Sequence, residues 1–135
     1  MRIVLDTNVL VAAFTATGVC HQLYERALTT GQLFVSEAIT TELRRTLKTK
    51  FRRLSAQDVA EIVAAVSADA ELVEPAPLPL PVARDADDDA VLATALAGRA
   101  DIIVTGDNDL LVLKTYQRIR ILSPRGFLEF LDQPS

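Results

Sequence analysis

Two aspartates in this sequence follow apolar runs that have the character of buried strands. Asp6 comes directly after residues 2–5, and Asp107 comes soon after residues 102–105. If both runs are parallel strands, both carboxylates lie at the carboxyl end of the sheet, where ligands of α/β folds gather. Taken singly, each aspartate could equally be the cap of the helix that follows it.

A third aspartate, Asp88, heads the apolar stripe of a helix that we predict over residues 87–97. The residues three, four, seven and eight positions beyond it are apolar, so its carboxylate should share their inward face. Asp87 and Asp89 should point to solvent. A carboxylate on a buried face needs a partner, and the alternative to a functional site is an ion pair with Arg84 or interaction with the helix dipole.

A fourth acid, Glu42, lies at the border of the apolar stripe of an earlier helix, where it can lean over the rim of a cleft. Converging carboxylates with few basic neighbours are costly unless a cation binds. One histidine, His21, and one cysteine, Cys20, exclude multi-histidine and cysteine-rich sites. Oxygen ligands alone select Mg²⁺ or Mn²⁺. Such an ion typically works on phosphate, so the predicted reaction is phosphodiester hydrolysis.

A basic stretch follows Glu42 closely. Six of the fourteen basic residues fall within ten positions that contain no acid, as suits a flank that follows the phosphates of a nucleic acid. The stretch could also be a solvated helix end, where the helix dipole favours cations. Together with the acids, the pattern favours nucleic acid. The predicted contacts are Arg44, Arg45, Lys48, Lys50, Arg52 and Arg53.

Length and composition point to one α/β domain. The chain has 135 residues, of which 50% are hydrophobic and 24% charged, as in a globular domain. Apolar strands that alternate with helical stretches predict a parallel sheet with helices on both faces. A strand over residues 119–121 should lie at its edge. The net charge of -4 excludes a globally basic nucleic-acid binder, but not a locally basic one.

No apolar run approaches the roughly 18 residues that a membrane span needs. The N-terminal apolar stretch is interrupted by Asp6 and Asn8 and has no convincing cleavage site, so a signal peptide is rejected. We therefore expect a soluble, cytoplasmic protein with no membrane partner.

Four segments resemble the acidic motifs of PIN-domain ribonucleases. The segments are LDTNVL at residues 5–10, residues 36–43, RDADDD at residues 84–89, and VTGDNDLL at residues 104–111. Their order and spacing match from residue 2 to about residue 131, and the four together are specific. Many relatives have Pro where this chain has Ala86, a departure that bears on loop rigidity rather than on chemistry.

The resemblance implies a PIN-like three-layer sandwich, with a central parallel sheet flanked by helices, as a single nuclease domain over residues 1–135. Within the family, the chain resembles small prokaryotic toxins of toxin–antitoxin pairs, relatives of VapC. This implies a Mg²⁺- or Mn²⁺-dependent endoribonuclease, usually a homodimer, that a small antitoxin protein holds inactive. The implied catalytic and metal-binding residues are Asp6, Glu42, Asp88 and Asp107, with Asn8, Thr105 and Asp109 as supporting polar residues.

Other functions stay open beside this one. A haloacid-dehalogenase-like phosphatase also begins with a strand that ends in Asp, but it needs a second Asp two positions on, where this chain has Asn8. A housekeeping RNA-processing PIN nuclease is a closer alternative. A catalytically inactive module that binds RNA or an antitoxin is another, although the presence of all four acids argues against it.

Overall fold

The structure, a computed structural model of the chain, describes residues 1–79, 82 and 86–133. Six strands form one sheet in the order β3-β2-β1-β4-β6-β5. The strands are β1 (Arg2–Leu5), β2 (Gln32–Val35), β3 (Ala70–Leu72), β4 (Ile102–Val104), β5 (Thr115–Tyr116) and β6 (Ile119–Leu122). The helices are α1 (Thr7–Thr15), α2 (Val19–Thr30), α3 (Glu37–Lys50), α4 (Ala56–Asp69), α5 (Ala86–Ala97), α6 (Asn108–Leu111) and α7 (Pro124–Asp132).

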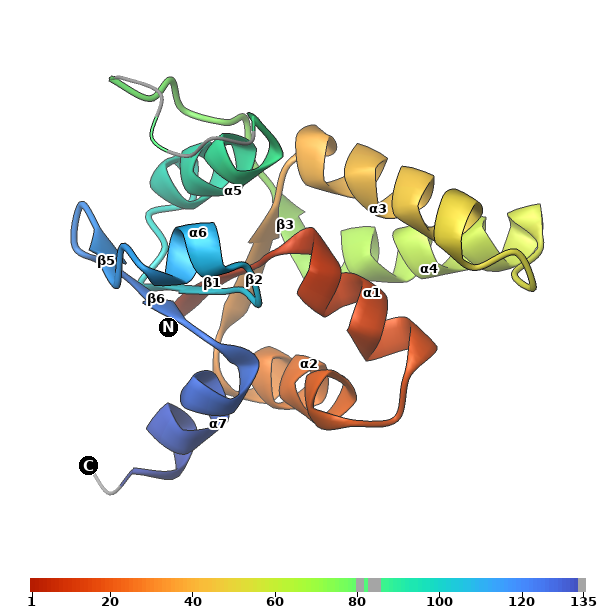
Figure 1. Cartoon of the computed structure of the whole chain (residues 1–135), viewed down its shortest axis with the longest axis horizontal. Helices are drawn as coiled ribbons and strands as arrows, with labels where there is room; N and C mark the ends of the chain where they lie inside the picture. The colour runs from red at the N-terminus through yellow and green to blue at the C-terminus, as the bar shows by residue number, and fades with distance from the viewer. Residues whose placement is uncertain (80–81, 83–85, 134–135) are drawn as a thin grey trace.

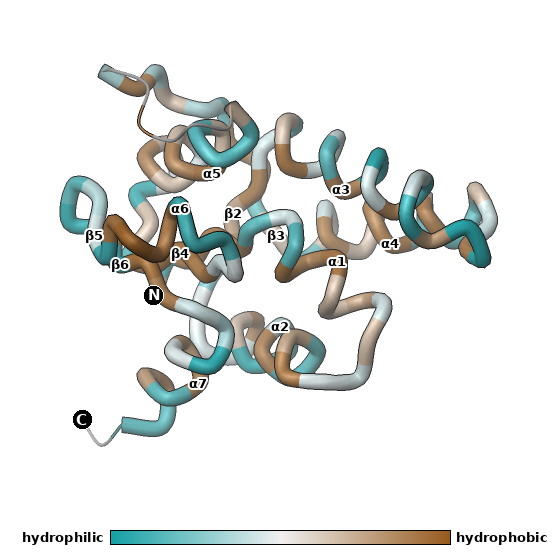
Figure 2. Tube along the Cα trace, in the orientation of Figure 1, coloured by the Kyte–Doolittle hydropathy of each residue, from teal (hydrophilic) through white to brown (hydrophobic). Residues whose placement is uncertain are grey.

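Helices flank the sheet, with α5 on one side and α2 and α7 on the other (Figure 1). The central strands are buried on both faces, as the apolar runs predict. Figure 2 shows these strands as mainly hydrophobic segments, and the turn between α3 and α4 as hydrophilic. The predicted α/β sandwich is therefore confirmed. No helix in the described residues is long and apolar enough to cross a membrane.

The order of the strands reverses beside β1. β1 pairs in parallel with β2 on one side and with β4 on the other. The chain reaches β2 and β3 by moving in one direction and returns to β4 on the opposite side of β1. In a doubly wound sheet this switch point opens a crevice at the carboxyl ends of the two strands. The residues after β1 and after β4 therefore meet there.

The edge of the sheet differs from the prediction. The strand expected at the edge over residues 119–121 is β6, which pairs in parallel with β4 and antiparallel with β5, so it is an inner strand of a mixed sheet. A two-residue turn joins β5 to β6, with φ 45° at Gln117 and 72° at Arg118. Such turns usually carry Asn or Gly. Because this turn carries neither, the hairpin could not be predicted from its turn residues.

Candidate metal centre

The first aspartate of the candidate site, Asp6, extends from the end of β1. Its backbone N–H donates to the carbonyl of Val104, the last residue of β4, at 2.9 Å. The carboxylate is buried, and its Oδ1 accepts from the N–H of Thr7 at 2.7 Å, which caps α1. This capping role was the alternative held open for Asp6. Capping fixes the carboxylate at the switch point of the sheet, so the two roles are compatible.

Asp107 has the same arrangement after β4. It caps the one-turn helix α6, since its Oδ1 accepts from the N–H of Asp109 at 2.8 Å. The buried hydroxyl of Thr105 joins the two capping residues, because it donates to Oδ2 of Asp6 at 2.6 Å and accepts from the N–H of Asp107 at 3.0 Å. One threonine thus fixes the ends of two adjacent strands relative to each other.

Asp88 lies on the buried face of α5, as its helical position predicts. It is 5% exposed, whereas Asp87 is exposed. Asp89 is half-buried rather than fully solvated, and it accepts from the N–H of Val82 at 3.1 Å. Val82 therefore lies against the first turn of α5. Arg84, the partner considered for Asp88, lies outside the described residues.

Among the described residues, one group of three acidic side chains could hold a metal ion. It consists of Asp88, Asp107 and Asp109, each offering a carboxylate oxygen within 4.8 Å of the other two. Mg²⁺ binds oxygen at about 2.1 Å, so ligands on opposite sides of it stand about 4.2 Å apart. At most two of three such ligands stand opposite each other, and neighbouring ligands of an octahedral ion stand about 3.0 Å apart, so binding would draw the three carboxylates together. The donors are hard oxygens without nitrogen or sulfur, so the residues fit Mg²⁺ or Mn²⁺.

Two of the four predicted metal-binding acids, Asp88 and Asp107, are in this acidic group. Asp6 and Glu42 are linked to it indirectly, by a chain of hydrogen bonds through Thr105 and Thr7. Asp6 reaches Asp107 through Thr105. Glu42, on α3, accepts at Oε2 from the hydroxyl of Thr7 at 3.1 Å. The membership of all four in one metal site stays a prediction.

Two residues that the resemblance named as supporting have different positions. Asp109 is the third member of the acidic group, brought there by the turn that Asp107 caps. Asn8 is exposed in the first turn of α1. Thr7, which no residue pattern singled out, is fully buried and forms hydrogen bonds with both Asp6 and Glu42. Its position between these two acids depends on the packing of α1 against α3, which the sequence alone does not reveal.

Residues 2–109 match the family model described as PIN domain. They span β1 to the start of α6 and include Asp6, Glu42 and the acidic group. The chain belongs to the PIN-domain family.

Two solved structures share this PIN fold. One is the crystal structure of VapBC2 from Rickettsia felis bound to a DNA fragment from their promoter, with a TM-score of 0.65 and 13% identity over 91% of this chain and 98% of that chain. The other is FitAcB from Neisseria gonorrhoeae, with a TM-score of 0.55 and 14% identity over 91% and 98% of the two chains. At these identities the likeness concerns the fold alone. No curated protein sequence matches the chain.

The basic stretch of this PIN domain divides into two parts. Arg44, Arg45 and Lys48 line a shallow hollow of about 280 Å³ along α3. The Arg45 guanidinium also lies 3.6 Å from the carboxylate of Asp87, which joins this part to the head of α5. Lys50, Arg52 and Arg53 line a second cavity, of about 570 Å³, with Phe14. Since α3 rises about 1.5 Å per residue, Lys50 lies about 12 Å along the helix from Glu42. The first part therefore begins beside Glu42 and reaches the head of α5 through Arg45, whereas the second part lies further along the helix.

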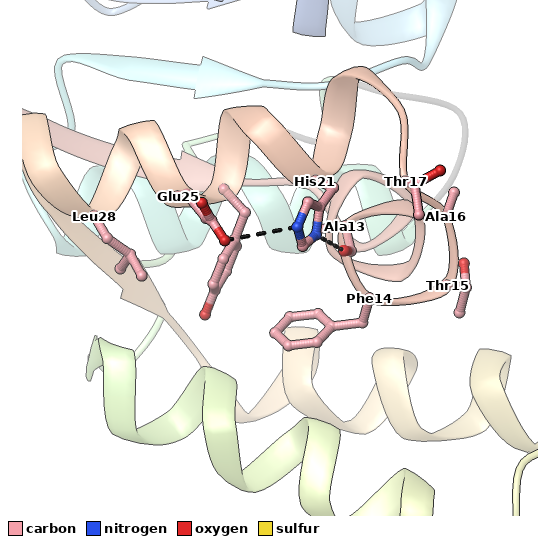
Figure 3. Close-up of a pocket in the computed structure, with 9 residues that line it drawn as sticks. Ala13, Phe14, Thr15, Ala16, Thr17, His21, Glu25 and Leu28 are labelled. Carbon is pink, nitrogen blue, oxygen red and sulfur yellow. Dashed lines mark hydrogen bonds and ion pairs between the residues drawn. The ribbon is translucent and has the colours of Figure 1, made fainter.

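A further cavity of the PIN domain is not lined by Asp88, Asp107 or Asp109. It has a volume of about 500 Å³ and is lined by α1 and α2, with Phe14 and Leu28 among its apolar residues (Figure 3). His21 stands at its wall, where Nδ1 lies 3.1 Å from the carbonyl of Ala13 and Nε2 lies 3.6 Å from Glu25. None of the acidic group lines this cavity. This cavity is therefore separate from the candidate metal site.

The environment of Glu42 raises the pKa of its carboxyl above the usual range. Partial burial is the main cause, and the charge of Asp87 is the next. The hydrogen bond from Thr7 opposes the shift, because it favours the ionised form. A raised pKa means that the folded state holds the proton more tightly than the unfolded chain. The free energy of unfolding therefore falls as pH rises from the pKa of Glu42 in the unfolded chain through its pKa in the folded state.

We expect Glu42→Gln to become progressively more stable relative to the parent as pH rises through the titration of Glu42, since glutamine cannot ionise. The free energy of unfolding, measured by urea denaturation of both proteins in metal-free buffer at several pH values, checks this. A difference that is constant over this pH range would show that ionisation of Glu42 does not oppose folding.

Proposed function

We propose that this PIN domain is a Mg²⁺- or Mn²⁺-dependent endoribonuclease and the toxin of a toxin–antitoxin pair. PIN domains are nucleases, and the observation that carries the proposal is the acidic group at the switch point of the sheet. The catalytic and metal-binding residues in this proposal are Asp6, Glu42, Asp88 and Asp107, with Asp109 added from the geometry.

The proposed reaction divides the labour among these side chains. Asp88, Asp107 and Asp109 would hold the ion, which when bound supplies stabilisation of phosphoryl charge and activation of water. Asp6 is fixed by two hydrogen bonds, so its carboxylate is oriented in advance. Glu42 has a raised pKa, which makes it a better proton acceptor than an ordinary glutamate. Thr105 keeps Asp6 and Asp107 in register.

Transcriptome-wide mapping of RNA 5′ ends after induced expression tests the ribonuclease activity. We expect new 5′ ends at defined sites with the parent and none with Asp6→Asn. Asparagine remains a good helix cap, so this variant should stay folded while losing the charge. Identical 5′ ends in both strains, or no new ends in either, would contradict the proposed activity.

The partners proposed for a toxin are a small antitoxin protein and a second copy of the chain. One of the similar folds was solved as VapBC2 with promoter DNA, which is the reason to place an antitoxin here. A small reading frame that overlaps the start of this gene would favour the toxin, and its absence would favour the housekeeping RNA-processing nuclease. Co-expression of that frame should relieve growth arrest caused by the parent.

The part of the basic stretch next to the acids is proposed to bind RNA phosphates. Lys48 tests this best, because Arg45 is engaged with Asp87. We expect Lys48→Gln to weaken RNA binding and to reduce the slope of log affinity against log salt by about 0.7. Filter binding in metal-free buffer measures both quantities. Lys114→Gln, just before β5 and outside the basic stretch, is the control. An unchanged slope for Lys48→Gln would leave the stretch as a solvated helix end.

A further inference from the structure

Thr7 joins two acids that come from different parts of the fold. It is the first residue of α1, and its side chain is fully buried. Its backbone N–H donates to Oδ1 of Asp6 at 2.7 Å, and its hydroxyl donates to Oε2 of Glu42 at 3.1 Å. Asp6 follows β1, whereas Glu42 lies 35 residues further on than Thr7, on α3. Thr7 is therefore a bridge between the strand end and the neighbouring helix.

The charges around Glu42 do not hold it in this position. Asp87 and Asp6 both disfavour its ionised form, which means that they repel the carboxylate. Arg45 attracts it, but the exposed Arg45 guanidinium is also engaged by Asp87 at 3.6 Å. In the described part of the chain, the Thr7 hydroxyl is the hydrogen-bond donor to Glu42. A half-buried glutamate with two like charges nearby would otherwise turn toward solvent, where its rotamer entropy is higher.

We propose that Thr7 is a positioning residue, whose hydroxyl holds the Glu42 carboxylate beside Asp6 in the orientation that the reaction needs. The proposal deepens the proposed nuclease function and rests on it. Thr7 would not touch the ion or the RNA, and it would act through Glu42. Partners of this kind typically change metal affinity or activity by about 10–100-fold when they are removed.

Two substitutions separate positioning from simple packing. Thr7→Val keeps the shape and the backbone N–H that caps through Asp6, but it removes the hydroxyl. Thr7→Ser keeps the hydroxyl and loses a buried methyl group, so it leaves a small void. If Thr7 only fills space, serine is the more harmful change. If its hydroxyl positions Glu42, valine is the more harmful change.

The test measures the Glu42 rotamer and the reaction in the same three proteins. Side-chain three-bond couplings from NMR, in metal-free buffer, should give one rotamer of Glu42 in the parent and in Thr7→Ser, and averaged rotamers in Thr7→Val. In RNA cleavage, Thr7→Val should lose about 10–100-fold in kcat with little change in KM. Thr7→Ser should stay within a few-fold of the parent.

A single fixed Glu42 rotamer in Thr7→Val would overturn the proposal, as would a Thr7→Ser variant that loses as much kcat as Thr7→Val. The couplings need neither metal nor RNA. If the parent cleaved no RNA, the proposed nuclease function would fail, and the couplings alone would still show whether Thr7 holds Glu42.

Discussion

Asp88→Asn is expected to lower the rate of RNA cleavage by about 10²–10³-fold, because a lost carboxylate ligand removes several kcal/mol of transition-state stabilisation. Asp88 is 5% exposed and its carboxylate belongs to the acidic group. Asparagine has nearly the same volume, so the apolar stripe of α5 should pack as before. Single-turnover cleavage of a labelled RNA pool gives the rates.

The matched control is Asp89→Asn, one residue further along the same helix. Asp89 is half-buried and accepts from the N–H of Val82, a bond that an asparagine oxygen can still accept. We expect its activity to stay within a few-fold of the parent. Asp87→Asn is a weaker control, because it also releases Arg45 and changes the charge next to Glu42. Equal losses in Asp88→Asn and Asp89→Asn would contradict the assignment of the inward carboxylate.

Asp107→Asn is expected to weaken Mn²⁺ binding strongly, as measured by calorimetry. Asparagine caps helices as well as aspartate does, so α6 should survive while the charge is lost. The parent should also gain thermal stability when Mn²⁺ is added, since a ligand that binds only the folded state stabilises it by mass action. The variant should gain little at the same concentration.

Asp101→Asn serves as the control for Mn²⁺ binding. Asp101 precedes β4 at the opposite end of the strand from Asp107, and its carboxylate accepts from the N–H of Arg2 at 2.8 Å. Its variant should bind Mn²⁺ like the parent. If folded Asp107→Asn bound Mn²⁺ with the affinity of the parent, the acidic group would not be the metal site.

Much of the candidate site could be predicted from helical periodicity and from the residues that follow the strands. The inward position of Asp88 could be predicted because an α-helix repeats every 3.6 residues, so the apolar residues after it define its face. Asp6 and Asp107 could be predicted because parallel strands present their carboxyl ends at one edge. Both predictions depend only on local sequence and on one rule of sheet topology.

The features that could not be predicted depend on contacts between segments far apart in the sequence or on irregular local structure. Asp109 joins the acidic group through a helix of one turn, which is too short to give a periodic pattern. The bond from Thr7 to Glu42 and the ion pair between Arg45 and Asp87 exist because α3 packs against both α1 and α5. The turn at residues 117–118 adopts positive φ values without glycine. Sequence patterns carry no signal for such features.

Cleavage of a labelled total-RNA pool by the purified protein tests most directly whether the acidic group uses a divalent ion to hydrolyse RNA. We expect cleavage with Mg²⁺ or Mn²⁺, none after chelation by EDTA, and recovery when the metal is restored. Asp88→Asn, purified in parallel, should be inactive throughout. Cleavage that persists in EDTA, or that is equal in Asp88→Asn, would contradict metal-dependent hydrolysis at the acidic group. A parent that cleaves no RNA with either metal would contradict it as well.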